Sequence, residues 1–218
     1  MKHMVVMVAD SEMEAAVNGF FKNPAYHTKL GCKAFDFNSQ GDLVKLKNDP
    51  EVFHNGHEYL RGYVESHQYA LVMLDKECGM THSAEEMAQH ITDNLLSVGW
   101  SEDRIHVMVI DPELEVLLWQ EDTRRLEEAV GCTLAAGGLR QWLIDHKHWP
   151  AGTPAPVDPK AAIDAVIGCS AIRRKNKSHA RVYGKFAEIV SLRHCTNGTF
   201  GALQGQVQAW FPAEWAAA

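Results

Sequence analysis

The chain lacks a long hydrophobic run and any cysteine pattern of a disulfide-rich or zinc-stapled protein. No stretch of its 218 residues approaches the 18 consecutive apolar residues that a transmembrane helix needs. Its five cysteines are scattered, odd in number and form no Cys-x-x-Cys pair. This usage argues against a disulfide framework and against structural zinc. We therefore expect a protein without a membrane partner, located in a reducing compartment, the cytoplasm.

Several short motifs of common enzyme classes are also missing. The sequence contains no glycine-rich phosphate loop and no nucleophile elbow, which weakens the case for an ordinary small-molecule α/β enzyme. Its twelve histidines cluster only at His54/His57 and His146/His148, without the Cys or Glu partner of a metal motif. The apolar start at residues 1–9 lacks the full hydrophobic region and cleavage site of a signal peptide, so we interpret it as a strand.

What is present is the composition of a globular protein with an uneven charge. Apolar residues make up 46% of the chain, enough for a sizeable core in one domain, or in one domain with an appended subdomain. The net charge is −7, but residues 151–218 hold eight basic and four acidic residues, a net +4. Residues 1–150 therefore carry −11. An acidic body with a basic C-terminal segment fits either a metal site beside a phosphate-binding face or a solvated helix face.

The hydrophobic pattern predicts an α/β fold, with a small, mainly parallel sheet flanked by helices and a C-terminal helical subdomain. Continuous apolar runs at 3–9, 70–74 and 104–110 are typical of strands buried on both faces, and residues 35–37 suggest a short second strand. Helical patterns follow each run, and strand–helix alternation favours a parallel sheet with right-handed crossovers. The predicted helices cover 11–21, 52–66, 84–98, 112–119, 121–130, 139–146, 160–172 and several stretches beyond.

Helix start signals and one linker divide this pattern. Ser11/Glu14 and Ser83/Glu86 have capping-box spacing. Asp111-Pro112 and Asp158-Pro159 each fit an N-cap followed by proline at the first helical position. Residues 149–156 are rich in proline and glycine. We therefore expect an α/β domain at 1–149, a linker at 150–157 and a basic helical subdomain at 158–218.

Acidic residues follow two of the predicted strands. Asp75 and Glu77 come directly after the apolar run 70–74, and Asp10 follows the first strand at the corresponding level. In open α/β sheets, ligands bind beyond the carboxyl ends of the strands. Mg²⁺ prefers one or two carboxylates together with water and substrate phosphate. The alternative is that Asp75 caps a turn and Glu77 is solvated.

The acids and their surroundings resemble the motifs of one family. A strand ending in Glu-Gly-x-Ser/Thr-Glu, a strand ending in Asp-x-Asp and an Ile-Glu-Ala-Trp-Leu helix characterise the Toprim fold of topoisomerases, primases and OLD-type nucleases. The three elements here read Asp10-Ser-Glu-Met-Glu14, Asp75-Lys-Glu77 and Leu114-Glu-Val-Leu-Leu118-Trp119. Together with Tyr183-Gly-Lys185, they are similar to small stand-alone Toprim-like proteins of bacterial phage-defence loci. Asp10 replaces the family's glutamate, without the following glycine, and the second acid of Asp-x-Asp is Glu77.

The resemblance implies metal-dependent phosphodiester chemistry by a nuclease or nucleotidyl-transfer subunit. It implies that Asp75, Glu77 and Glu115 hold Mg²⁺ or Mn²⁺ and that Asp10 and Glu14 act in catalysis. Nucleic acid and an ATPase of the defence system would be the partners. Backbone contacts with nucleic acid would come from the basic run Arg173, Arg174, Lys175 and Lys177. The alternative is a catalytically impaired Toprim-like adaptor that serves protein assembly.

Overall fold

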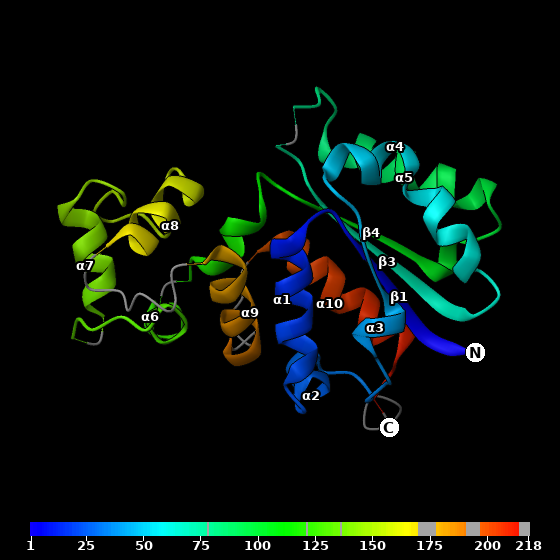
Figure 1. The fold of residues 1–218 in the computed structure, drawn as a ribbon, viewed down its shortest axis with the longest axis horizontal. Helices are drawn as coiled ribbons and strands as arrows, with labels where there is room; N and C mark the ends of the chain where they lie inside the picture. Colours follow the sequence, from blue (N-terminus) through cyan, green and yellow to red (C-terminus); the bar gives the residue numbers. More distant parts are fainter. Residues whose placement is uncertain (78, 121, 136, 170–177, 191–196, 214–218) are drawn as a thin grey trace. The chain divides into compact units, whose positions relative to one another are not determined.

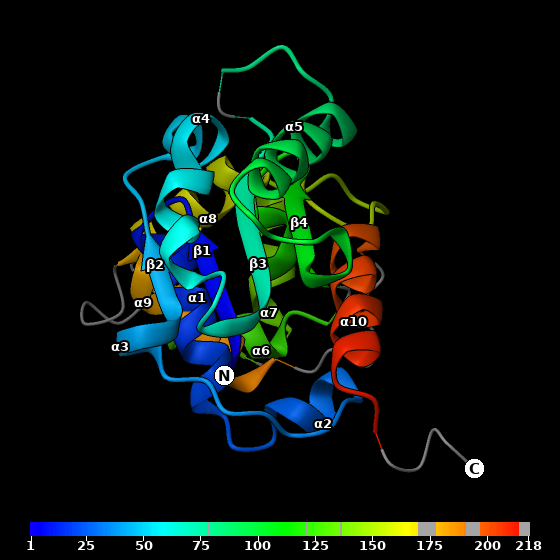
Figure 2. The same ribbon diagram turned by 90° about the vertical axis from the view of Figure 1, so that its right-hand side faces the viewer.

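One four-stranded sheet organises the first part of the molecule. The computed structural model describes residues 1–77, 79–120, 122–135, 137–169, 178–190 and 197–213. Its strands are β1 (Lys2–Val8), β2 (Leu43–Lys45), β3 (His67–Asp75) and β4 (Ile105–Ile110), and all of their pairings are parallel. They lie in the order β2-β1-β3-β4 (Figures 1 and 2). The predicted α/β class with a parallel sheet is therefore confirmed.

The central strands form where the apolar runs were continuous. Residues 4–8 of β1 and 70–74 of β3 are all buried, as expected for strands covered on both faces. The edge strand β2 is short and partly exposed. The predicted strand at 35–37 is wrong, because this segment is irregular and the Phe35 ring stacks on the Phe211 ring, with centroids 4.1 Å apart.

Helices cover both faces of this sheet. α4 (Asp49–Leu60) and α5 (Ala84–Ser97) lie on one face, and α10 (Gly198–Trp210) lies on the other (Figure 2). The Trp210 ring at the end of α10 stacks on the Tyr69 ring of β3, with centroids 4.6 Å apart. The predicted capping box of α5 is confirmed, since Ser83 and Glu86 bond to each other's backbone N–H. The helix predicted at 52–66 begins earlier and ends in a 3₁₀ turn, η1 (Arg61–Tyr63).

The chain divides into two compact units. The first comprises Met1–Glu14, Pro24–Glu113 and the described part of Ser191–Ala218, and it contains the sheet, the short helices α2 (Tyr26–Leu30) and α3 (Ser39–Asp42), and the 3₁₀ turn η2 (Glu102–Arg104). The second comprises Ala15–Asn23 and Leu114–Val190. This division differs from the expected one at 150–157, because residues on both sides of the proline-rich segment belong to the second unit.

The second unit is helical. Its elements are η3 (Leu114–Leu118), α6 (Arg124–Val130), α7 (Gly138–Asp145), α8 (Pro159–Gly168) and α9 (His179–Ile189), with the later turns of α1 (Ser11–Lys22). The predicted cap of α8 is confirmed, because Asp158 accepts a hydrogen bond of 2.8 Å from the N–H of Ala161. The α-helix predicted after Asp111-Pro112 is wrong, since only the 3₁₀ turn η3 forms there.

Among the described helices, none is long and apolar enough to cross a membrane.

Candidate functional site

The strand order places a topological switch point between β1 and β3. The chain passes from β1 to β2 on one side, and β3 then lies on the other side of β1. The connections on the two sides of such a switch point diverge, so ligands of open α/β sheets bind at the carboxyl ends of the strands there. Val8 of β1 pairs with Met73 of β3. Asp10 follows the end of β1 by two residues and Asp75 ends β3, so both acids lie at the carboxyl end of the sheet although they are 65 positions apart in sequence.

Asp10 occupies the N-terminus of α1. Its Oδ1 atom accepts hydrogen bonds from the backbone N–H groups of Glu12 at 2.8 Å and Met13 at 2.9 Å. Asp10 is therefore the cap of α1, and the prediction that Ser11 has this role is wrong, because the helix begins one residue earlier than the Ser11/Glu14 capping box requires. The Oδ2 atom of Asp10 accepts no hydrogen bond from the part of the chain that the structure describes.

Asp75 is the last residue of β3 and is half-buried. Its backbone N–H donates a hydrogen bond of 2.7 Å to Oδ1 of Asp49 in the first turn of α4. Asp49 thus brings a third carboxylate to the end of β3 and connects α4 to that strand. Sequence reasoning missed Asp49, although Asn48-Asp49-Pro50 carries the same signal as Asp158-Pro159, a polar cap followed by proline in the first turn.

Glu77 does not continue the strand. The successive N–H groups of Lys76 and Glu77 donate to Ile110 and Pro112, both at 2.9 Å. In a regular strand alternate N–H groups, not successive ones, point toward the same neighbour. The extended geometry that would align the Glu77 and Asp75 side chains therefore stops at Asp75, and Glu77 is exposed. The prediction that Glu77 is a metal ligand assumed that its side chain is aligned with that of Asp75, and the structure does not show this alignment.

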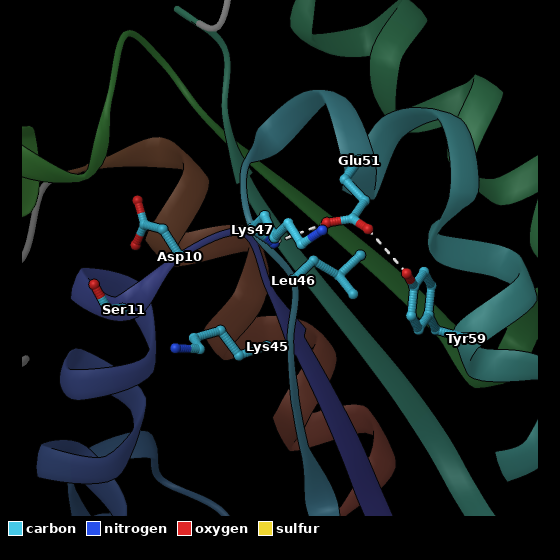
Figure 3. A pocket seen from close by; sticks show the side chains of 7 residues that line it. All are labelled: Asp10, Ser11, Lys45, Leu46, Lys47, Glu51 and Tyr59. Atoms are coloured by element: carbon cyan, nitrogen blue, oxygen red, sulfur yellow. Dashed lines mark hydrogen bonds between the residues drawn. The ribbon is translucent and has the colours of Figure 1, made fainter.

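A pocket of about 390 Å³ opens beside Asp10. Residues at the start of α1, after β2 and on α4 line it, as Figure 3 shows: Asp10, Ser11, Lys45, Leu46, Lys47, Glu51 and Tyr59. Leu46 is buried, and its N–H donates a hydrogen bond of 3.0 Å to the carbonyl of Val8, which extends the pairing with β1. Lys45 and Lys47 are exposed, and Figure 3 shows Lys45 extending toward α1 and Lys47 toward Glu51.

Glu51 and Tyr59 form one wall of this pocket. The Glu51 carboxylate accepts hydrogen bonds of 2.9 Å from the Lys47 N–H and from the Tyr59 hydroxyl. These two bonds, first that of Lys47, lower the pKa of Glu51, and the Glu51 charge in turn raises the pKa of Tyr59. Glu51 therefore stays ionised at neutral pH and fixes the Tyr59 ring on the open side of the pocket.

Glu14 lies next to this pocket through an ion pair. Its Oε2 atom is 3.4 Å from Nζ of Lys45, and both side chains are partly exposed. An exposed pair of this kind contributes little stability, so Lys45 is free to exchange Glu14 for an anionic ligand at small cost. The structure thus places Glu14 near the pocket, while its catalytic role stays a prediction.

The remaining predicted site residues lie elsewhere. Glu115 belongs to the second unit, is buried, and accepts a hydrogen bond of 2.7 Å from the Tyr183 hydroxyl. This contact gives Glu115 a structural role in its own unit, and its assignment as a metal ligand stays a prediction. The basic run of Arg173, Arg174, Lys175 and Lys177 lies outside the described residues.

The donor set of the edge suits a hard cation bound through few protein ligands. Asp10 and Asp75 offer carboxylate oxygens, the ligands that Mg²⁺ and Mn²⁺ prefer. Among the described residues, no group of three or more His, Cys, Asp or Glu side chains is arranged to hold a metal. Mg²⁺ commonly takes one or two carboxylates and completes its shell with water and substrate phosphate. Asp10 and Asp75 together supply the number of carboxylates that such an ion needs, whereas the described residues form no closed cage of protein ligands.

Comparisons of the chain with known protein families, with curated proteins and with solved structures find no match.

Proposed function

We propose that the carboxyl edge of β1 and β3 carries out divalent-metal-dependent cleavage or transfer at a phosphodiester. The observation that carries this proposal is the parallel pairing of β1 with β3, because Asp10 follows the end of one strand and Asp75 ends the other, at the switch point of the sheet. Asp10 and Asp75 would hold Mg²⁺ or Mn²⁺, with water and a substrate phosphate as the other ligands. The motif resemblance to Toprim proteins supports the same chemistry.

The bound cation and the residues of this edge would have different roles in the reaction. A bound cation would neutralise charge that develops on the phosphate and acidify a coordinated water. In hydrolysis, the water oxygen bonds to phosphorus while the bond to the leaving oxygen breaks and that oxygen takes up a proton. The α1 backbone orients Asp10 through two N–H groups, and Asp49 fixes the end of β3 through the Asp75 N–H. The first contact holds the Asp10 carboxylate in position before substrate arrives, and the second holds the backbone of Asp75.

Calorimetry with Mn²⁺ tests this proposal. We expect one Mn²⁺ to bind, and Asp75→Asn to weaken binding at least tenfold, because the substitution removes the charge and keeps the size of the side chain. Asp10→Asn should weaken it similarly. Glu65→Gln, which removes an exposed acid elsewhere in the same unit, is the matched control. Hydrolysis of 4-nitrophenyl thymidine 5′-phosphate should require Mn²⁺ and fall in parallel. Equal Mn²⁺ affinity and equal hydrolysis in Asp75→Asn and in the control would refute the proposal.

A second candidate, a non-catalytic adaptor, is favoured by one observation. Among the described residues no group of three or more metal-ligating side chains exists, and the Oδ1 atom of Asp10 is used in capping α1. In this alternative, a partner such as an ATPase of a phage-defence system would co-purify equally with the wild-type protein and with Asp75→Asn. Loss of that complex in the variant would count against the adaptor.

A further inference from the structure

The pocket beside Asp10 has the size of a small-molecule site. Its volume of about 390 Å³ falls in the lower part of the range for small ligands and cofactors, roughly 300–1,000 Å³. A nucleotide fits such a space, whereas a nucleic-acid duplex needs a long open groove. Asp10 lines this pocket, so a ligand bound here would reach one of the two carboxylates of the proposed metal site.

The cationic groups of this pocket suit a phosphate. Lys45 and Lys47 are both exposed and both line the pocket, with the buried Leu46 between them in sequence. Figure 3 shows Lys45 extending toward α1 beneath the Ser11 side chain and Lys47 extending toward Glu51. Ammonium and hydroxyl groups together provide charged and neutral donors for phosphate oxygens.

The opposite wall suits the nucleoside part of such a ligand. Tyr59 is 46% exposed, and its hydroxyl is held by Glu51, so the ring presents an open face in a fixed orientation. An ordered aromatic ring is a stacking surface for any base. The side chain of Leu46 adds apolar surface to the lining between the two walls.

Charge around the pocket argues against a long polyanion. The first 150 residues carry −11, and acidic side chains continue past the pocket along the edge, at Asp49, Asp75, Glu77 and Asp111. A nucleic-acid backbone running along this edge would meet like charge at each step. A ligand with one phosphate group meets the two lysines and the two acids of the lining, Asp10 and Glu51, instead of the whole acidic edge.

We propose that this pocket binds a phosphate ester of nucleotide size, either a free nucleotide or the terminal nucleotide of a strand, with the exposed side chains of Lys45 and Lys47 turning onto its phosphate and Tyr59 against its base. This assignment rests on the proposed function, because the ligand would be the substrate of the metal site proposed at Asp10 and Asp75. Its binding contacts come from other residues, so the two are separable by experiment.

Titration with thymidine 5′-monophosphate tests the assignment, by calorimetry in Mn²⁺ and again in EDTA. We expect saturable binding in both buffers, and Lys45→Ala and Lys47→Ala should each weaken it about tenfold through loss of a charge-assisted hydrogen bond. Lys33→Ala is the control, because Lys33 is an exposed lysine of the same unit that does not line the pocket. Tyr59→Leu should also weaken binding, whereas Tyr59→Phe should retain most of it. Circular dichroism checks that each variant is folded.

The outcomes separate the two proposals. Binding that depends on Lys45 and Lys47 in EDTA supports the pocket even if no Mn²⁺ binds. Normal Mn²⁺ binding, with nucleotide affinity equal in Lys45→Ala, Lys47→Ala and Lys33→Ala, overturns the pocket and leaves the metal proposal standing. A short oligonucleotide is then added to compete with the nucleotide for the pocket. If it competes only when it carries a 5′-phosphate, the ligand is identified as a strand end. Competition by the 5′-hydroxyl oligonucleotide as strong as that by the nucleotide would overturn the assignment in favour of a nucleic-acid track.

Discussion

Asp42 is the centre of a charged network at the amino edge of the sheet. It is 4% exposed and accepts hydrogen bonds from Nζ of Lys2 at 2.6 Å and from the N–H of Asn38 at 2.7 Å. Nε2 of His67, also buried, lies 3.2 Å from Oδ1 of Asp42, and Nδ1 of the same ring is 2.8 Å from Oγ of Ser66. These contacts join the starts of β1 and β3 to α3, so the network fixes the edge opposite the candidate site.

Stability should depend on Asp42 at neutral pH and less so in acid. Burial alone would raise the pKa of Asp42, but the hydrogen bonds from Lys2, Asn38 and His67 outweigh it and the pKa is lowered. A carboxyl group with a lowered folded pKa stabilises the protein above its unfolded pKa of about 4, and this contribution disappears as pH falls through the folded value. We expect Asp42→Asn to cost about 1–3 kcal/mol at pH 7.

Urea unfolding of the wild-type protein and Asp42→Asn between pH 7 and pH 3 measures this difference. The gap between the two should narrow below about pH 4. A gap that stays constant over this range would show that the charge of Asp42 contributes nothing.

At the scale of elements, α1 and α9 approach each other closely in the second unit. A Cβ atom added at Gly19 would collide with the backbone carbonyl of Gly184, and one added at Gly184 would lie 3.1 Å from the carbonyl oxygen of Ala15. These glycines let the two helix backbones come together. A second contact holds the pair, since the Asn23 side-chain amide donates a hydrogen bond of 2.7 Å to the carbonyl of Glu188.

Gly19→Ala should therefore be destabilising, although alanine favours a helix more than glycine does. The backbone of Gly184 cannot move aside as a flexible side chain would, so we expect a loss of about 1–3 kcal/mol from overpacking. Gly205→Ala in α10 is the matched control, because an added Cβ meets no atom within 4 Å there. That substitution should stabilise by about 0.5–1 kcal/mol. Thermal unfolding compares the two; equal effects would contradict the tight crossing.

The elements that sequence patterns predicted correctly are those with a strong local signal. β1, β3 and β4 are apolar runs, and α5 and α8 begin at polar caps that the structure retains. β2 was missed because it has three residues and is partly exposed, so it has no apolar run of its own. Phe35 was placed in a strand because its partner, Phe211, lies far away in sequence.

The missed strand explains the missed pocket. Asp10 and Asp75 could be predicted as strand-end acids, because each follows a recognisable strand. Lys45 ends β2 and Lys47 follows it, so without that strand nothing connected them to Asp10. Tyr59 falls within the helix predicted at 52–66, whose pattern does not separate it from the apolar side chains, whereas it is exposed and bonded to Glu51. Its position depends on where α4 begins, at Asp49, and therefore on the Asn48-Asp49-Pro50 signal.

At the scale of the whole molecule, the net charge of −7 and the pI near 5.9 affect the binding of nucleic acid. Each phosphate neutralised by a lysine or arginine releases counterions, so the salt dependence of binding counts these contacts. The pocket offers two lysines, whereas the basic run of Arg173, Arg174, Lys175 and Lys177 would add four contacts. Binding through the pocket alone therefore involves two phosphate contacts, whereas binding that includes the basic run involves six.

A salt titration with a 5′-phosphorylated single strand should therefore give a shallow slope. Two phosphate contacts predict a slope of log K against log salt of about −1.4, and six contacts predict about −4. We expect the shallow value, measured by fluorescence anisotropy, and Lys47→Ala should reduce it by about half. A steep slope that persists in Lys47→Ala would assign binding to the basic run instead.

Anomalous diffraction from a crystal soaked with Mn²⁺ tests the central claim most directly. A peak bonded to carboxylate oxygens of Asp10 and Asp75, absent from an Asp75→Asn crystal grown in the same way, is the result we predict. A peak elsewhere, or none beside these two carboxylates at saturating Mn²⁺, would contradict the metal site at the carboxyl edge of β1 and β3.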